Sequence, residues 1–171
     1  KKLIVNLSLV VFYLALANNI GIAQEELLPD LVVTSINTPA SASTQEQLEA
    51  SWTVKNQGEG KASQGQYMQG WYTALYLSTD NQLDGSDTNI TIDLRSEPLA
   101  PTESYTVTRT INIPAVPAGN YYLLGVVDSW PLYNNIYESN EENNVLAQPI
   151  TIKVPDLVVT SIQAPLAVST Q

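Results

Sequence analysis

The sequence predicts an all-β fold, a seven-stranded antiparallel immunoglobulin-like β-sandwich, and three observations support this. First, apolar residues between positions 29 and 154 alternate with polar ones at a period of two, which is typical of half-buried strands. Second, clusters of Pro, Gly, Asn and Asp separate the apolar runs at short intervals. Third, no segment after residue 28 has the 3.6-residue period of an amphipathic helix. Short strands with regular turn signals favour a sandwich.

The first three expected strands differ in how far their faces are buried. Residues 31–36 form a short apolar run at the start of the domain. In the second strand, around Trp52, apolar side chains at positions 48, 50, 52 and 54 alternate with polar ones, so one face contacts water. The third strand, residues 71–78, is apolar and aromatic enough to be covered on both faces.

Four more strands complete the predicted domain. Residues 90–94 form the weakest of them, and residues 105–111 alternate apolar side chains with threonines. Residues 121–127 are densely apolar, and residues 150–152 close the unit. We therefore expect seven strands within about one domain length of chain.

Composition excludes several classes of function. The 171 residues include no Cys and no His, which excludes disulfides, Ser-His-Asp and Cys-His catalysis and the usual zinc sites. The seven basic and seventeen acidic residues give a formal charge of −10. Nucleic acid is not an expected partner, because binding to its phosphates depends on Lys and Arg. An acidic module, or an enzyme that works with carboxylates alone, remains.

The first 23 residues have the pattern of a secretory signal peptide. Two lysines precede an apolar run over residues 3–16, and Gly21 and Ala23 supply small residues before a cleavage point. The alternative is a membrane anchor, but the apolar run is shorter than the ~20 residues of a spanning helix. We predict a short linker at residues 24–28, no membrane span, and a secreted or cell-surface location.

An octapeptide occurs twice in the chain. Residues 29–36 and residues 155–162 both read Pro-Asp-Leu-Val-Val-Thr-Ser-Ile, and later matches raise the identity to 12 of 17 positions. The spacing of 126 residues is that of a whole domain rather than of a small solenoid unit. We predict one complete repeat at residues 29–154, and the first strand of a second, truncated repeat at residues 155–171.

Five short motifs occur in order along this repeat: Pro-Asp-Leu-Val-Val at residues 29–33, Ser-Trp-Thr-Val-Lys-Asn-Gln-Gly at 51–58, Tyr-Leu-Ser-Thr-Asp at 76–80, Pro-Ala-Gly-Asn-Tyr-Tyr at 117–122, and Glu-Ser-Asn-Glu-Glu-Asn-Asn at 138–144. Together they resemble the CARDB module, the cell-adhesion-related domain found in bacteria. The resemblance covers residues 29–154, with another copy beginning at 155–171. It implies an immunoglobulin-like sandwich, a tandem arrangement, residence in exported or surface proteins, and adhesion.

The first of two acidic loops, residues 80–87, contains Asp80, Asp84 and Asp87 and is a candidate calcium site. Calcium prefers oxygen ligands supplied from a turn. The match to an EF-hand loop is incomplete, because Gln82 and Thr91 occupy positions where that loop has acidic or amide ligands. The alternative is a polar hairpin turn whose Asp side chains bind the local backbone.

The second acidic loop, residues 128–144, is also a candidate calcium site. Its candidate ligands are Asp128, Glu138, Asn140 and Glu142. Crowded carboxylates and amides with only distant positive charges either repel one another or share a cation. The resemblance adds weight, because the family's copies also carry an acidic Asn-rich stretch before the last strand. The alternative is a solvated loop whose Asn residues close turns.

These loops follow the third and sixth expected strands, which are antiparallel in an immunoglobulin sandwich. We therefore expect them at opposite poles of one domain, where they cannot share a site. In a head-to-tail array, however, the first loop would approach Asp156 and the acidic loop of the next repeat. This predicts a calcium-stiffened joint that involves Asp80, Asp84, Asp87 and Asp156.

The three tryptophans have different expected roles. Trp52 and Trp71 lie in predicted strands and are expected in the core. Trp130 lies in a predicted loop with Tyr133 and Tyr137, and these three are candidate contacts to a protein or carbohydrate. The alternative is that Trp130 anchors its loop against the sandwich.

The sequence predicts a non-catalytic extracellular module that mediates adhesion, ligand binding or protein interaction. Its expected partners are adjacent copies of the repeat and a cell-surface protein or carbohydrate. Carboxylate pairs such as Glu138 with Glu142 could hydrolyse glycosides, but they lie in loops that read as exposed, without a buried site that raises a pKa. The alternative function is a passive calcium-stiffened spacer stalk that presents a catalytic domain encoded downstream.

Overall fold

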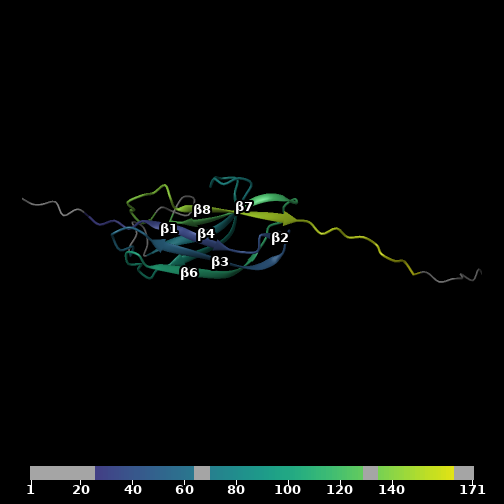
Figure 1. The fold of residues 1–171 in the computed structure, drawn as a ribbon, viewed down its shortest axis with the longest axis horizontal. Coiled ribbons are helices and arrows are strands. Elements are labelled where there is room, and N and C mark those ends of the chain that lie inside the picture. Colours follow the sequence, from purple (N-terminus) through teal and green to yellow (C-terminus); the bar gives the residue numbers. More distant parts are fainter. Residues whose placement is uncertain (1–25, 64–69, 129–134, 164–171) are drawn as a thin grey trace, which may run out of the picture.

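The computed structural model describes residues 26–63, 70–128 and 135–163, and in these ranges it contains strands but no helix (Figure 1). The strands of the described residues are β1 (Leu31–Asn37), β2 (Ser41–Ser43), β3 (Gln47–Asn56), β4 (Trp71–Ser78), β5 (Thr88–Arg95), β6 (Ser104–Asn112), β7 (Gly119–Val127) and β8 (Val145–Lys153). The predicted signal peptide lies outside the described residues, and no helix within them could span a membrane.

The strands form two sheets, which confirms the predicted all-β sandwich. One sheet has three antiparallel strands in the order β1-β3-β6, and the other has the order β2-β8-β7-β4-β5. The predicted count of seven was wrong, because β2 is an eighth strand that pairs in parallel with the end of β8. A three-residue strand is too short to show an alternating pattern. The immunoglobulin-like character of the fold stays a prediction.

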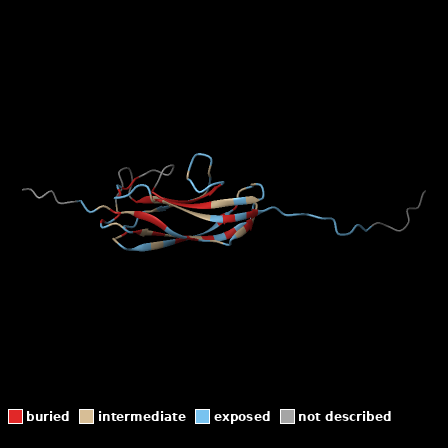
Figure 2. Cartoon of the chain, turned by 45° about the horizontal axis from the view of Figure 1, so that its top comes forward, coloured by how far each residue is buried: buried red, intermediate tan, exposed pale blue. Residues whose placement is uncertain are grey.

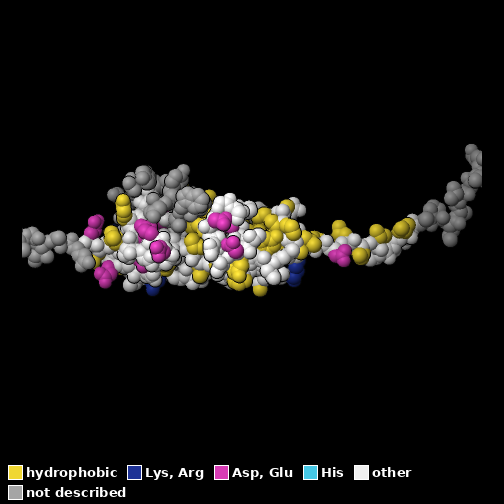
Figure 3. Space-filling view, turned by 90° about the horizontal axis from the view of Figure 1, so that it is seen from above, with side chains coloured by type: hydrophobic (Ala, Val, Ile, Leu, Met, Phe, Trp, Pro, Cys, Tyr) yellow, Lys and Arg dark blue, Asp and Glu magenta, His cyan; other side chains and the backbone are white. Residues whose placement is uncertain are grey.

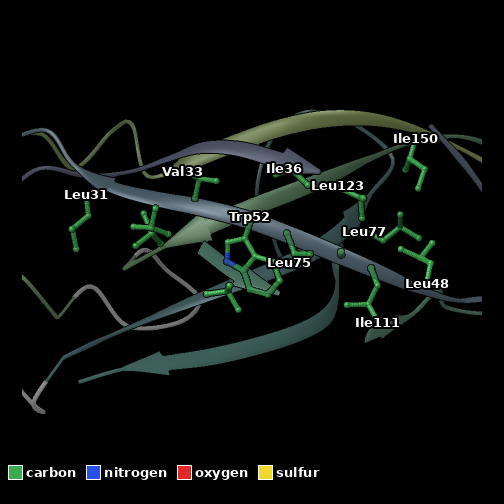
Figure 4. Packing of buried hydrophobic residues seen from close by; sticks show 14 of the residues in the cluster. Leu31, Val33, Ile36, Leu48, Trp52, Leu75, Leu77, Ile111, Leu123 and Ile150 are labelled. Atoms are coloured by element: carbon green, nitrogen blue, oxygen red, sulfur yellow. The ribbon is translucent and has the colours of Figure 1, made fainter. Parts of the chain in front are cut away.

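The main core lies between the two sheets and contains Trp52 and Trp71, as the sequence predicts (Figures 2 and 4). Both indoles are fully buried. Trp52 Nε1 in β3 donates to Thr73 Oγ1 in β4 at 2.9 Å, and this hydroxyl donates to the carbonyl of Val126 at 2.8 Å. The indole polar group is therefore satisfied by the facing sheet, as a buried donor requires.

A second apolar cluster lies on the outer face of the five-stranded sheet. It consists of Ala74, Tyr76, Leu124 and Val126, and Leu83 from the loop between β4 and β5 packs against it. Strand β4 is therefore covered on both faces, as predicted for residues 71–78. The cover is partly this loop, which folds back over the sheet.

The chain enters and leaves the sandwich at opposite ends (Figure 1). Residues 26–30 lead into the start of β1, and β8 ends at Lys153 at the other end. Residues 154–163 are exposed and belong to no strand, although residues 155–162 repeat the sequence of residues 29–36. The second repeat that this octapeptide predicts stays a prediction.

Candidate functional site

The start of β1 is held by a network of buried and half-buried polar side chains that we call the β1 clamp. Its members are Asp30, Asn56, Glu138, Asn143 and Asn144. At its centre, one carboxylate oxygen of Glu138 accepts a hydrogen bond from the backbone N–H of Leu31. The other oxygen accepts one from the Asn144 side chain, at 2.8 Å. The second acidic loop therefore binds the first strand, although Leu31 and Glu138 are 107 residues apart in the sequence.

Asp30 of the repeated octapeptide joins the clamp to two separate loops. Its carboxylate accepts hydrogen bonds from Asn143 Nδ2 at 2.9 Å and from Gln57 Nε2 at 3.0 Å. Its backbone N–H donates to Asn56 Oδ1 at 3.1 Å. Because one residue holds both loops by side chain and backbone, Asp30 sets the place where β1 begins.

The loop after β3 approaches the chain before β1 so closely that it needs glycine. A Cβ atom on Gly58 would lie 2.5 Å from the backbone nitrogen of Asp30, and one on Gly60 would lie 1.9 Å from the carbonyl oxygen of Leu27. Both distances are shorter than any real contact of a Cβ atom. This accounts for the glycines that follow Asn56 in the sequence.

The clamp buries negative charge. Glu138 is only 6% exposed, and burial raises its pKa to about 8, with Asp128 and Glu141 adding to the effect. Burial also raises the pKa of the fully buried Asp128 to about 6, although its carboxylate accepts hydrogen bonds from the N–H groups of Asn135 and Ile136. The expectation that these loops offer no buried, pKa-raising site was therefore wrong, because tertiary packing covers Glu138.

Two amide oxygens in the clamp have no hydrogen-bond partner among the described residues. They are Oδ1 of Asn143 and Oδ1 of Asn144, and Asn144 is 2% exposed. A buried acceptor without a partner costs free energy, so such atoms are rare in native proteins. Carboxylate and amide oxygens are the ligands that calcium prefers. The clamp's donor chemistry therefore fits a hard cation, although the described part of the chain holds no group of three acidic side chains placed to bind a metal.

The predicted ligands of the first acidic loop instead bind their own backbone. Asp80 accepts from the N–H of Gln82 at 2.8 Å, and Asp87 accepts from the N–H of Asp84 at 2.8 Å. Asp84 accepts from both the N–H and the hydroxyl of Ser86, and these hydrogen bonds lower its pKa. This is the geometry of the polar turn that was the alternative to calcium.

The expected separation of the two acidic loops was only half right. Strands β4 and β7 are antiparallel, as predicted. However, the first loop bends back over the sheet, so Asn81, Gln82 and Leu83 line one pocket together with Glu141 and Glu142. Loops that follow opposite ends of antiparallel strands can still meet when one of them folds along the sheet face.

The other predicted residues lie apart from the clamp or outside the described residues. Asp156 belongs to the exposed segment of residues 154–163 after β8. This segment leaves the sandwich at the end opposite the start of β1 (Figures 1 and 3). Asn140 is exposed and accepts from the N–H of Glu142, which is a local turn contact. Tyr137 is 72% exposed, whereas Trp130 and Tyr133 lie outside the described residues. The predicted joint of Asp156 with Asp80, Asp84 and Asp87 concerns two successive repeats, so it stays a prediction.

Sequence reasoning named Glu138 but missed Asp30, Asn56 and Asn144 as members of the same network. One signal was present, since Asp30 belongs to the octapeptide that recurs with Asp156 in the same place. An identical Pro-Asp at the start of both copies indicates a role for that aspartate at the start of the strand.

Three comparisons place the chain among known proteins. The family model of CARDB matches residues 28–148. A crystal structure of a CARDB domain from Pyrococcus furiosus, described as a complex with di-metal ions, is 24% identical, with a TM-score of 0.52, over 74% of this chain and 90% of that one. The solution NMR structure of that domain is 23% identical, with a TM-score of 0.52, over 74% of this chain and 97% of the other. No curated protein matches the chain.

The buried carboxylate of Glu138 predicts a pH dependence in buffer that contains a chelator. A pKa raised from 4.5 to about 8 stabilises the fold below pH 4.5, and this contribution is lost as the pH rises through 8. The free energy of unfolding in urea should fall by about 1.4 kcal/mol between pH 7 and pH 9, a window that lies above the pKa of about 6 of Asp128.

Glu138→Gln should remove this fall, and Glu142→Gln, at an exposed position, should keep it. An equal pH dependence in the two variants would contradict the assignment.

Proposed function

The chain belongs to the CARDB family, and from this premise we propose that it is a non-catalytic connecting module in an exported, head-to-tail chain of β-sandwich domains. The observation that carries the proposal is the position of the chain ends: the chain enters at the start of β1 and leaves at the end of β8, at opposite ends of the sandwich (Figure 1). A module with this geometry adds its length to an array.

The repeated octapeptide supports this arrangement. Only Val154 separates the end of β8 from Pro155, where the sequence that begins the described domain starts again. A one-residue connection that leads into a proline leaves little freedom between successive domains. Such an array would act as a spacer that holds other domains away from a surface.

The clamp's chemistry argues against a catalytic role for Glu138. A general acid needs a buried carboxyl group with a raised pKa, and Glu138 has both properties. However, its two oxygens already accept hydrogen bonds from Leu31 and Asn144. The carboxylate serves the fold, and CARDB is a family of non-catalytic modules.

We further propose that calcium binds at the β1 clamp and stiffens the module. Glu138 would supply a carboxylate, and Asn143 and Asn144 would supply their unpartnered amide oxygens. The bound cation would neutralise buried negative charge and partner these oxygens at once. The metal ions of the Pyrococcus furiosus CARDB structure support this proposal at the level of the family.

A second candidate function is ligand contact through the loop aromatics. Tyr137 is 72% exposed and lines a pocket together with Leu27, Lys61 and Ile136. An exposed aromatic side chain at a pocket with mixed polar and apolar lining is a feature of protein and carbohydrate contacts. This surface lies next to the clamp, so it would be presented at one end of each module.

The connecting role predicts an elongated two-domain protein. A chain in which residues 29–154 are repeated once after residue 154 should give a small-angle scattering profile of two domains arranged end to end, with roughly twice the maximum dimension of one domain. A control with eight Gly-Ser residues inserted after Val154 should give a broader distribution of dimensions. Two domains packed side by side would contradict the proposal.

The calcium proposal predicts uptake at Glu138. Calorimetric titration of the chelator-treated protein should detect binding, and calcium at a hundredfold excess over Kd should raise the free energy of unfolding by about 2.7 kcal/mol. Glu138→Gln should abolish both effects, because it removes the charged ligand.

The matched control is Asp84→Asn in the first acidic loop, which should bind calcium as the unsubstituted chain does. Loss of binding in Asp84→Asn with retention in Glu138→Gln would place the cation in the first loop instead.

A further inference from the structure

The sandwich is open along one side, where the outermost strands of the two sheets face each other without pairing. Strand β5 ends the five-stranded sheet, and β6 ends the three-stranded one. A cleft of about 230 Å³ lies between these two strands, and Asp93, Arg95, Tyr105 and Arg109 are among the residues that line it. No member of the clamp contributes to the cleft, so its chemistry is separate from that of the clamp.

Both arginines of this acidic chain line the cleft, but only one of them has a carboxylate partner. Arg109 forms an ion pair with Asp93 at 2.6 Å. The guanidinium carbon of Arg95 lies 4.0 Å from the centre of the Tyr105 ring, and its Nε donates to the carbonyl of Glu97 at 3.0 Å. No acidic side chain of the described residues lies within ion-pair distance of Arg95.

The guanidinium of Arg95 is therefore held in place with its charge uncompensated by a carboxylate. The stack on Tyr105 and the bond from Nε fix its plane, whereas its two terminal nitrogens keep their donors for another acceptor. A planar fork of N–H donors matches a carboxylate, which accepts two parallel hydrogen bonds. The cleft thus fits a carboxylate that comes from outside the domain.

Strand β5 presents different chemistry on its two faces. Asp93 and Arg95 face the cleft between the sheets. Ile92 and Leu94 alternate with them and lie on the outer face, where Ile92 is opposite Ala74 of the outer apolar cluster. Ile92 is 48% exposed and Leu94 is 51% exposed. A strand placed beside β5 would meet a cation on one face and apolar side chains on the other.

The size of the cleft favours a side chain over a whole ligand. Its volume of about 230 Å³ is below the ~300 Å³ at which pockets for small molecules begin. The edge of β5 away from β4 has no strand partner among the described residues. We propose that β5 is the docking edge for an extended acidic segment of a partner protein, which adds as a further strand and places an Asp or Glu side chain on Arg95.

The inward charges of β5 make this edge selective. Charged side chains that point inward usually protect an edge from pairing, because an incoming strand would remove them from water. Asp93 already has Arg109 as its partner, so Arg95 alone needs a compensating group. A neutral strand is therefore rejected, and a strand with a carboxylate opposite Arg95 is accepted.

Strand β6 is a poorer acceptor, although it is also at an edge of its sheet. Where β5 exposes Ile92 and Leu94 on its outer face, β6 exposes threonines at positions 106, 108 and 110. An acidic strand with apolar residues on its other face gains contacts with β5 that β6 does not offer.

The test measures binding of a labelled peptide, Ser-Val-Thr-Val-Glu-Val-Thr-Val-Ser, to the full chain by fluorescence anisotropy. This sequence reads the same in both directions, so it can pair with β5 parallel or antiparallel. We expect saturable binding, and a loss of about tenfold or more in affinity when the peptide's Glu is replaced by Gln or when the protein carries Arg95→Gln. The matched control Lys153→Gln removes the same charge at the end of β8 and should bind as the unsubstituted chain does.

A second variant, Leu94→Ser, keeps the guanidinium and should also weaken binding, and circular dichroism should show that both variants of β5 keep the fold. Amide hydrogen exchange should slow in β5 and not in β6 when the peptide is bound. No binding by the unsubstituted chain, equal binding of the Glu and Gln peptides, or slowed exchange in β6 instead of β5 would overturn the proposal.

Discussion

The hydrogen bond between the buried carboxylate of Glu138 and the N–H of Leu31 is the contact on which the rest of this domain depends. β1 is an edge strand, paired on one side only, and a slip of one residue would turn its apolar side chains from the core to solvent. The clamp prevents this slip by binding the strand's first residue and the aspartate before it. The register of β1 against β3 therefore rests on a loop more than 100 residues away in sequence.

This contact places the carboxyl group of Glu138 in the interior, where a negative charge must be compensated. The described residues form a single ion pair, between Arg109 and Asp93, and it does not involve the clamp. Glu138 must therefore take up a proton or share a cation to be buried at low cost. The unpartnered oxygens of Asn143 and Asn144 favour the cation, because a proton on Glu138 can bond at most one of them. A cation bound at the clamp would stabilise the module by holding its first strand in place.

Much of the fold follows from local pattern, whereas the clamp does not. Alternation around Trp52 predicts a half-buried strand, and the dense run at residues 71–78 predicts a strand covered on both faces. The short β2 forms by pairing with β8, and Leu83 packs on the outer face of the sheet. Both depend on contacts between distant residues, so a short stretch of sequence does not predict them. The partners of Asp30 lie 26 to 113 residues away, so their convergence cannot be read from spacing. Glu138 was found because carboxylates crowd its loop, but its burial is a property of the folded domain.

Amide hydrogen exchange of β1 tests the central claim most directly, since the claim is that a cation at Glu138 secures the strand. The N–H groups of residues 31–33 should exchange at least tenfold more slowly when calcium is added to the chelator-treated protein, while those of β5, at an edge of the other sheet, should not change. In Glu138→Gln, calcium should have no effect on either strand. Exchange in β1 that is indifferent to calcium, or slowed equally in both strands, would contradict the account.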